Sequence, residues 1–162
     1  MFSKRSTPKS ERAPQSSLEE QVVVSLLRTA EALSRWAESV LKPSGLSPTQ
    51  YNILRILRGA GERGLACGEV GERLISRDPD ITRLLDRMES RGWIARARQA
   101  EDRRVVKTRI TAEGLRILAE LDAPVQAFHR RQLRHIPARD LRQLAHLLER
   151  ARARVEPRDS PD

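Results

Sequence analysis

The chain has 162 residues, which is enough for one domain with its own core, or for one domain plus a dimerisation extension. Its formal net charge of +9 favours a polyanionic partner such as nucleic acid over an acidic small substrate, with an anionic membrane surface as the competing explanation. No apolar run is long enough to cross a bilayer, no secretory signal is recognisable, and the single cysteine, Cys67, excludes an internal disulfide, so we expect a cytoplasmic protein.

Residues 1–16 are rich in Ser, Pro and basic side chains, which predicts a disordered basic tail. Ser17 and Glu20 have the spacing of a capping box, so we expect a helix that begins there and runs to about Lys42, before Pro43 and Gly45. Its apolar stripe is too broad to be covered by one neighbouring element. We therefore predict that residues 17–45 form an N-terminal dimerisation helix.

A second helix is predicted to begin at the capping box of residues 47–50 and to end at a glycine-punctuated loop over residues 59–64. Leu65 and Ala66 suit a very short strand, and a small helix follows them. The apolar residues expected on this small helix are Val70, Leu74 and Ile75. By its spacing, the small helix forms a helix-turn-helix with the helix that comes next.

That next helix has a natural N-cap at Asp78, a proline at its first position, Pro79, and a natural stop at Gly92. Its apolar residues recur at helical spacing and are Ile81, Leu84, Leu85 and Met88. The polar residues that lie opposite this stripe or flank it include Thr82, Arg83, Asp86 and Arg87. A polar, cationic face of this kind suits a helix that enters a DNA major groove.

After Gly92 the apolar period changes from 3.6 to 2, which predicts strands over residues 93–99 and 105–110. The charged residues 100–104 lie between them, so the pair is expected to form a β-hairpin, or wing. The position of Thr111 indicates a cap for the following helix. Pro124 is expected to kink or interrupt that helix, which then resumes over residues 125–134 with Phe128 and Leu133 facing inward.

The sequence Ile136-Pro137 predicts a corner before the last helix. The apolar residues of that helix are Leu141, Leu144, Leu147 and Leu148. A small winged domain cannot cover the apolar faces of these helices, so we predict that residues 111–155 are C-terminal dimerisation helices. A polar tail is expected over residues 156–162.

Four motifs, in this order and spacing, resemble the MarR family of bacterial winged helix-turn-helix regulators. They are the segments LSPTQY at 46–51, ITRLLDRMESRG at 81–92, EDRR at 101–104 and TAEG at 111–114. The resemblance implies a mainly α fold with a small β-hairpin wing, and a winged helix-turn-helix DNA-binding domain over residues 46–110. It also implies a homodimeric transcriptional repressor that binds a pseudopalindromic operator. In many members of the family, a ligand or an oxidant relieves the repression.

The candidate residues for the major groove are Thr82, Arg83 and Arg87. Arg83 is best placed for the acceptor edge of a guanine. A bare carboxylate in the groove is repelled by the phosphates, so Asp86 is expected either to orient Arg83 or Arg87, or to accept a hydrogen bond from a cytosine. Pro79 and Asp80 depart from the hydroxyl residues common at this point in the family.

In the wing, the resemblance implies that Asp102 holds Arg104 so that its guanidinium enters the minor groove. Four further basic residues of the hairpin are expected to contact phosphates or the groove rim, and these are Arg96, Arg98, Arg103 and Lys107. Arg77, which precedes the α-helix predicted to enter the major groove, is a further DNA-binding candidate. The alternative is a merely solvated basic hairpin. We favour the DNA interpretation because the hairpin directly follows a helix-turn-helix.

Trp36, Tyr51 and Phe128 are candidates for an effector pocket, although core packing is the commoner role of such residues. Cys67 is expected to be a partly buried structural thiol rather than a redox switch. The three histidines, His129, His135 and His146, lack a ligand constellation, so no metal or other cofactor is expected.

Two further function classes compete with a sequence-specific regulator. One is a winged module for non-specific nucleic-acid binding or protein docking. The other is an enzyme, but the sequence shows no phosphate loop, nucleophile elbow or metal-ligand spacing to support it.

Overall fold

The computed structural model describes residues 16–76, 78–98 and 105–155. The chain divides into two compact units, with unit 1 ending at Pro48 and unit 2 beginning at Thr49. No helix in the described ranges combines the length and apolar character that a membrane crossing needs. The protein is mainly helical, with one small antiparallel sheet.

Unit 1 is dominated by the long helix α1, Leu18–Leu41, which is followed by the 3-10 turn η1, Lys42–Ser44. The predicted start is confirmed, because the Ser17 hydroxyl oxygen accepts a hydrogen bond from the backbone N–H of Glu20 at 3.1 Å. The segment ends at Gly45, whose φ of +69° lies in the left-handed region that glycine adopts without strain. Of the residues of α1, only Leu41 is buried.

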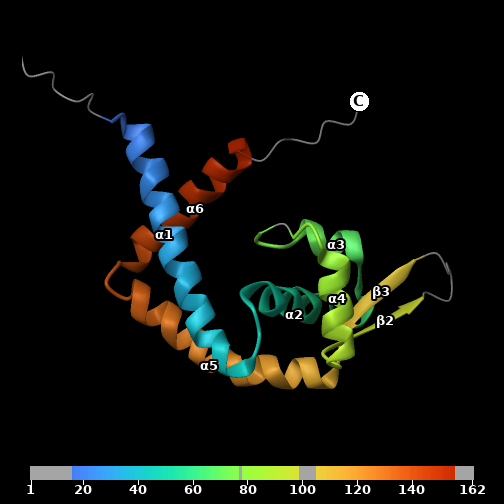
Figure 1. The fold of residues 1–162 in the computed structure, drawn as a ribbon. Helices are drawn as coiled ribbons and strands as arrows, with labels where there is room; N and C mark the ends of the chain where they lie inside the picture. Colours follow the sequence, from blue (N-terminus) through green and yellow to red (C-terminus); the bar gives the residue numbers. More distant parts are fainter. Residues whose placement is uncertain (1–15, 77, 99–104, 156–162) are drawn as a thin grey trace, which may run out of the picture. The chain divides into compact units, whose positions relative to one another are not determined.

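Unit 2, which begins at the second residue of helix α2, contains the winged helix-turn-helix and the two C-terminal helices (Figure 1). Its elements in chain order are α2 (Pro48–Ala60), η2 (Gly61–Arg63), β1 (Leu65–Ala66), α3 (Cys67–Glu72), α4 (Ile81–Ser90), β2 (Ile94–Arg98), β3 (Val106–Ile110), α5 (Ala112–Leu133) and α6 (Ala138–Val155). The sheet order is β1-β3-β2, and both pairings are antiparallel. In the register, Leu65 faces Thr108 and Arg98 faces Val106. The β2–β3 hairpin is the predicted wing.

The core of unit 2 lies where α2, α3, α4 and α5 meet the sheet. Its most buried side chains come from all of these elements and include Ile53, Leu54, Leu57, Leu65, Val70, Leu85, Met88, Ile94 and Leu118. The wing and α5 are joined through Thr111, whose hydroxyl donates to the Gly92 carbonyl at 2.6 Å and accepts from the Gly114 N–H at 3.1 Å. This confirms the predicted cap and places the start of α5 directly against the wing.

Only a glycine fits at position 114, because the backbone there passes directly against the backbone of Trp93. A Cβ at this position would overlap the Trp93 carbonyl oxygen, an approach that real Cβ atoms essentially never show. The backbone of α5 therefore approaches the segment between α4 and β2 more closely than any other residue type permits.

Several predicted boundaries are wrong. Helix α2 continues through Gly59 to Ala60, and only residues 61–63 form the 3-10 turn, because a glycine is tolerated in a helix that packs well. Helix α3 ends at Glu72, so Leu74 and Ile75 lie beyond it. Ile75 is 88% exposed, and its backbone N–H donates to the Asn52 side chain instead of continuing the helix.

The C-terminal helices also differ in part from expectation. Pro124 does not interrupt α5, which runs unbroken from Ala112 to Leu133 and changes direction along its length in Figure 1. Phe128 is buried as predicted, but Leu133 is 40% exposed, because it lies in the last turn of the helix. The predicted corner at Ile136-Pro137 is confirmed by the start of α6 at Ala138.

Candidate nucleic-acid interface

Helix α4 begins two residues later than the sequence suggested. A side-chain oxygen of Asp78 accepts the Asp80 backbone N–H at 2.9 Å, which forms a local turn in place of a helical start. Asp80 is therefore the residue before the helix, and its carbonyl accepts the Leu84 N–H at 3.1 Å. Pro79 lies in this turn and not at the first helical position.

The two faces of α4 separate as predicted. Leu84, Leu85 and Met88 are buried in unit 2. The side chains of four predicted groove residues are exposed, and these are Thr82, Arg83, Asp86 and Arg87. Arg83 lies 3.5 Å from the Asp80 carboxylate, and its side chain is 78% exposed, so solvent can replace that weak contact at little cost.

Asp86 has a different partner from the two that the sequence suggested. Its Oδ1 accepts a hydrogen bond from Arg96 Nη2 at 2.5 Å, so the carboxylate is joined to strand β2 and not to Arg83 or Arg87. The same guanidinium donates from Nε to Glu89 at 2.8 Å. Glu89 also accepts the Arg96 backbone N–H at 2.9 Å. Three hydrogen bonds therefore fasten β2 to α4.

This cluster, Asp86, Glu89 and Arg96, changes the expected role of Arg96. Its side chain is only 26% exposed and is held between two carboxylates, so a direct phosphate contact requires it to leave both. The hydrogen bond from Arg96 lowers the pKa of Glu89, which keeps that carboxylate charged. Arg96 therefore serves the geometry of the wing in this structure.

Lys107, a predicted phosphate or groove-rim contact, is likewise held by a carboxylate within unit 2. Its Nζ donates to Glu69 at 2.6 Å, and its side chain is only 16% exposed. Glu69 also accepts the Ala66 backbone N–H at 2.7 Å, so one carboxylate joins the start of α3 to strand β3. Lys107 and this backbone contact lower the pKa of Glu69 to about 2.

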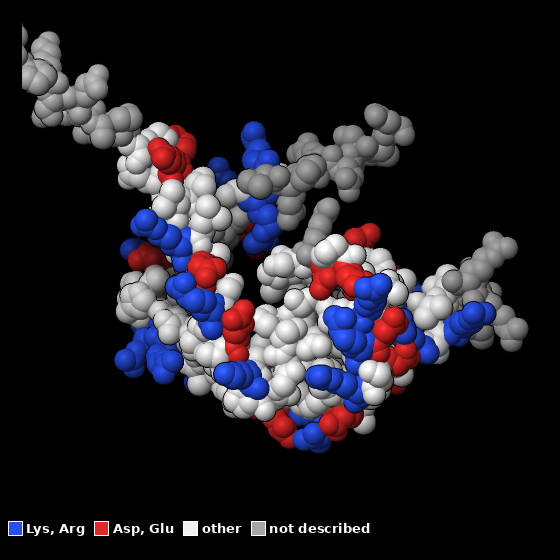
Figure 2. Space-filling model, in the orientation of Figure 1, with Lys and Arg blue, Asp and Glu red and all other residues white. Residues whose placement is uncertain are grey.

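The remaining predicted DNA contacts are placed as follows. Arg98 is exposed at the end of β2, where the hairpin leaves the body of unit 2. Arg77, Asp102, Arg103 and Arg104 lie outside the described residues. Figure 2 shows basic and acidic side chains alternating over the α4 side of unit 2, which agrees with the ion pairs of Arg83 and Arg96.

Sequence reasoning missed the two glutamates that organise the wing. Glu69 has the position of the acidic residue in a capping box, but Ala66 has no side-chain oxygen to complete the box, so only half of that signal is present in the sequence. No local pattern signals the contact of Glu89 with Arg96, because the two residues lie on different elements.

The three effector-pocket candidates lie on three different helices. Trp36 is on α1, Tyr51 is on α2 and Phe128 is on α5. Tyr51 is half-buried beneath the guanidinium of Arg55, and burial raises the pKa of its phenol. Phe128 is buried with its ring edge against His129, at a centroid distance of 5.7 Å.

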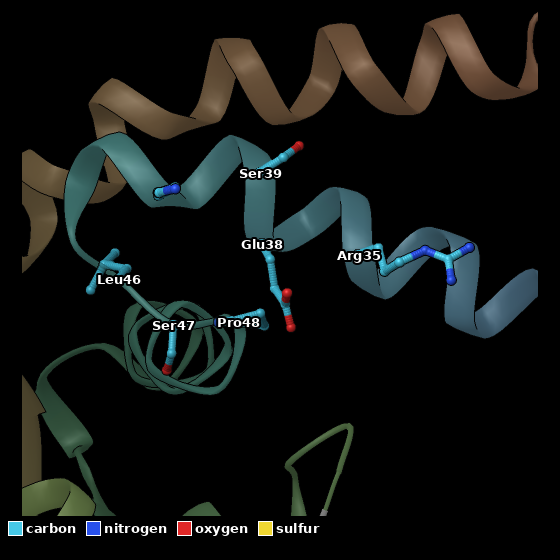
Figure 3. A pocket seen from close by; sticks show the side chains of 7 residues that line it. Arg35, Glu38, Ser39, Leu46, Ser47 and Pro48 are labelled. Carbon is cyan, nitrogen blue, oxygen red and sulfur yellow. The ribbon is translucent and has the colours of Figure 1, made fainter.

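Unit 1 contains an open hollow of about 510 Å³ that these candidates do not line (Figure 3). Its walls are Arg35, Glu38, Ser39, Lys42, Leu46, Ser47 and Pro48. Both basic and acidic side chains therefore border it.

Cys67 begins α3 as a partly buried free thiol, with its sulfur 3.8 Å from the Thr82 hydroxyl oxygen. Among the residues that the structure describes, no cluster of three or more His, Cys, Asp or Glu side chains has a metal-binding arrangement.

The fold and the polar face of α4 define a class of protein, the winged helix-turn-helix DNA-binding proteins. The model of the MarR family matches residues 46–106. A MarR transcription factor from Planctomyces limnophilus is 39% identical, covers 83% of this chain and 98% of its own, and superposes with a TM-score of 0.63. The chain belongs to the MarR family of transcriptional regulators.

Two other relatives extend this result. The transcriptional repressor MdtR of Bacillus subtilis is 30% identical over 107 residues, which are 66% of this chain and 68% of MdtR. The repressor CouR, whose structure was solved bound to a 23-mer DNA duplex, is 26% identical with a TM-score of 0.70, and the match covers 84% of this chain and 94% of CouR. The protein is thus a DNA-binding transcriptional regulator.

Proposed function

We propose that this regulator is a repressor that binds a pseudopalindromic duplex operator as a homodimer, with α4 in the major groove and the wing in the minor groove. One observation carries the proposal. Helix α4 buries its apolar side in unit 2 and leaves Thr82, Arg83 and Arg87 exposed together on the other. The repressor MdtR and the DNA-bound CouR support the same function.

The homodimer is supported by large apolar side chains that a single chain leaves exposed. On α1 they are Leu18, Val22, Val23, Val24, Leu26, Leu27 and Leu33, and on α6 they are Leu144 and Leu147. Large exposed apolar side chains in this number on a helix indicate an interface, and a second copy of the chain is the simplest cover. Two α4 helices held ~34–36 Å apart then read successive major grooves.

The test compares operator binding by the parent with binding by Arg83→Ala. A duplex selected from a random pool serves as operator, and fluorescence anisotropy gives the affinities. Loss of a guanine contact should cost ~1–3 kcal/mol on the operator and much less on random DNA. Arg116→Ala is the charge-matched control, because Arg116 lies on α5 and pairs there with Glu113 and Glu120.

The wing and the phosphate contacts are tested in the same assay. Arg104→Ala should weaken binding most at narrow, A·T-rich minor grooves. The logarithm of the affinity should fall steeply with the logarithm of the salt concentration, because each arginine bound to a phosphate releases counterions. Equal binding of random and selected duplexes would instead support the non-specific winged module.

Two finer parts of the proposal concern release and location. We propose a cytoplasmic location, because a regulator of chromosomal genes works where the chromosome lies. We also propose that a small-molecule effector releases the regulator from DNA, and that the hollow of unit 1 is the candidate binding site for this effector. Compounds that lower operator binding by the parent should then have a weaker effect on Lys42→Ala, while operator affinity without the compound stays unchanged.

A further inference from the structure

Asp86 lies on the side of α4 that the proposed function assigns to DNA, yet its charge has the wrong sign for a phosphate contact. Its side chain is 53% exposed. An ionised carboxylate only accepts hydrogen bonds, so a base edge must offer it a donor. Asp86 therefore either takes no part in reading the DNA or reads a base that presents an amino group.

Arg96 holds the Asp86 carboxylate in place and offsets its charge. The contact from Arg96 Nη2 to Asp86 Oδ1 is 2.5 Å, and the guanidinium is itself fixed to Glu89 through Nε at 2.8 Å. The backbone N–H of Arg96 donates to Glu89 as well. The carboxylate is thus aimed by a neighbour that is anchored twice, while half of its surface remains accessible.

The chemistry of the major groove selects the partner. Only cytosine, through N4, and adenine, through N6, present amino donors there. Adenine also places its acceptor N7 beside the amino group, and this lone pair repels a carboxylate oxygen. Cytosine has no such acceptor on its own edge, so it is the better match for an ionised Asp86.

We infer that Asp86 selects a cytosine in the operator half-site, and that Arg96, anchored by Glu89, is a positioning residue that aims the Asp86 carboxylate. The inference rests on the proposed function, because it requires α4 to enter the major groove. It assigns one base preference to one side chain and explains why an acidic residue stands among the basic residues of this face.

The experiment measures the affinity of the parent for operator duplexes in which each base pair is replaced in turn. The parent should prefer cytosine over thymine at one base pair of the half-site by about 5- to 150-fold. Asp86→Ala should lose this preference and keep those at the other base pairs. Asp86→Asn should move the preference toward adenine, because an amide pairs with adenine N6 and N7.

Arg96→Lys tests the positioning role. It keeps the positive charge but loses the planar guanidinium that joins Asp86 to Glu89, so the cytosine preference should shrink at the same base pair.

The two Asp86 variants also remove one negative charge, and Glu113→Gln is the control for that change. Glu113 pairs with Arg116 on α5, so the base preferences of Glu113→Gln should equal those of the parent.

The outcomes separate the inference from the function beneath it. Asp86→Asn retains an acceptor for Arg96, so its thermal unfolding should follow that of the parent and a change in base preference can be assigned to DNA contact. Unchanged preferences in both Asp86→Ala and Asp86→Asn, with a selective parent, overturn the role of Asp86 alone. A parent with no base preference overturns the proposed function as well.

Discussion

Helices α1 and α4 are both amphipathic, but the apolar side chains of α4 are buried by the rest of its unit and those of α1 are mostly exposed. The 10 residues of α4 include three that are buried, Leu84, Leu85 and Met88, so its apolar side is covered within unit 2. The 24 residues of α1 include one, Leu41. A helix whose apolar side is covered offers its polar side to a hydrophilic partner, whereas a helix with an uncovered apolar side needs an apolar partner.

The largest expected effect comes from disrupting the close contact between α5 and the segment that joins α4 to β2, within unit 2. Gly114→Ala places a Cβ against the Trp93 carbonyl, so the wing or α5 must shift, and unfolding in urea should show a loss of about 3 kcal/mol or more. Gly68→Ala is the matched control, because a Cβ there meets nothing within 4 Å. That variant, on helix α3, should be as stable as the parent or more so.

The next effect concerns the apolar side of α1. Leu33 is 44% exposed, so Leu33→Glu should leave the single chain folded, while a charge in an apolar interface should prevent dimerisation. Light scattering should then give the mass of one chain. Operator affinity should fall at least about 100-fold, because the second half-site is no longer tethered. Arg28→Glu, on the polar side of α1, should remain dimeric, and a dimeric Leu33→Glu would remove α1 from the proposed interface.

A smaller effect is expected at the ion pair that joins α2 to α5. Arg58 makes two hydrogen bonds to Asp122, at 2.8 and 3.0 Å, and they lower the pKa of that carboxyl. Both side chains are about a third or more exposed, so Asp122→Asn should cost about 1 kcal/mol or less in urea unfolding at neutral pH. This contribution is complete above the ordinary aspartate pKa and is lost as the pH falls from there through the lowered pKa of Asp122 in the folded protein. Equal stability of parent and variant at every pH contradicts this.

The smallest effect is a pH dependence at the wing. Because Lys107 and Ala66 lower the pKa of Glu69 from 4.5 to about 2, the stabilisation by this carboxylate is complete above pH 4.5 and is lost as the pH falls through 2. The thermal midpoint of the parent should therefore drop more over this interval than that of Glu69→Gln. Lys107→Met removes the larger of the two contacts and leaves the Ala66 N–H in place, so it should flatten the pH dependence only in part.

Much of the fold was predictable because it depends on local patterns. The stripe on α4, the alternation in the wing and the caps at Ser17 and Thr111 each involve residues within one or two turns of each other. The polar face with Thr82, Arg83 and Arg87 follows from the same helical period. The motifs of the MarR family also lie in continuous segments, so the family was recognisable from them.

Only the tertiary structure decided how the charges of the site are paired. Asp86 meets Arg96 across 10 positions, and Glu69 meets Lys107 across 38, in both cases between different elements. Such contacts depend on how α3 and α4 pack against the sheet, which no local period encodes. The later start of α4 has a local cause instead, the turn that Asp78 makes with Asp80, which competes with the helical start expected at the same residues. The sequence by itself determined which helix faces carry which chemistry, and folding determined which charges remain accessible, because ion pairs form only where packing brings their partners together.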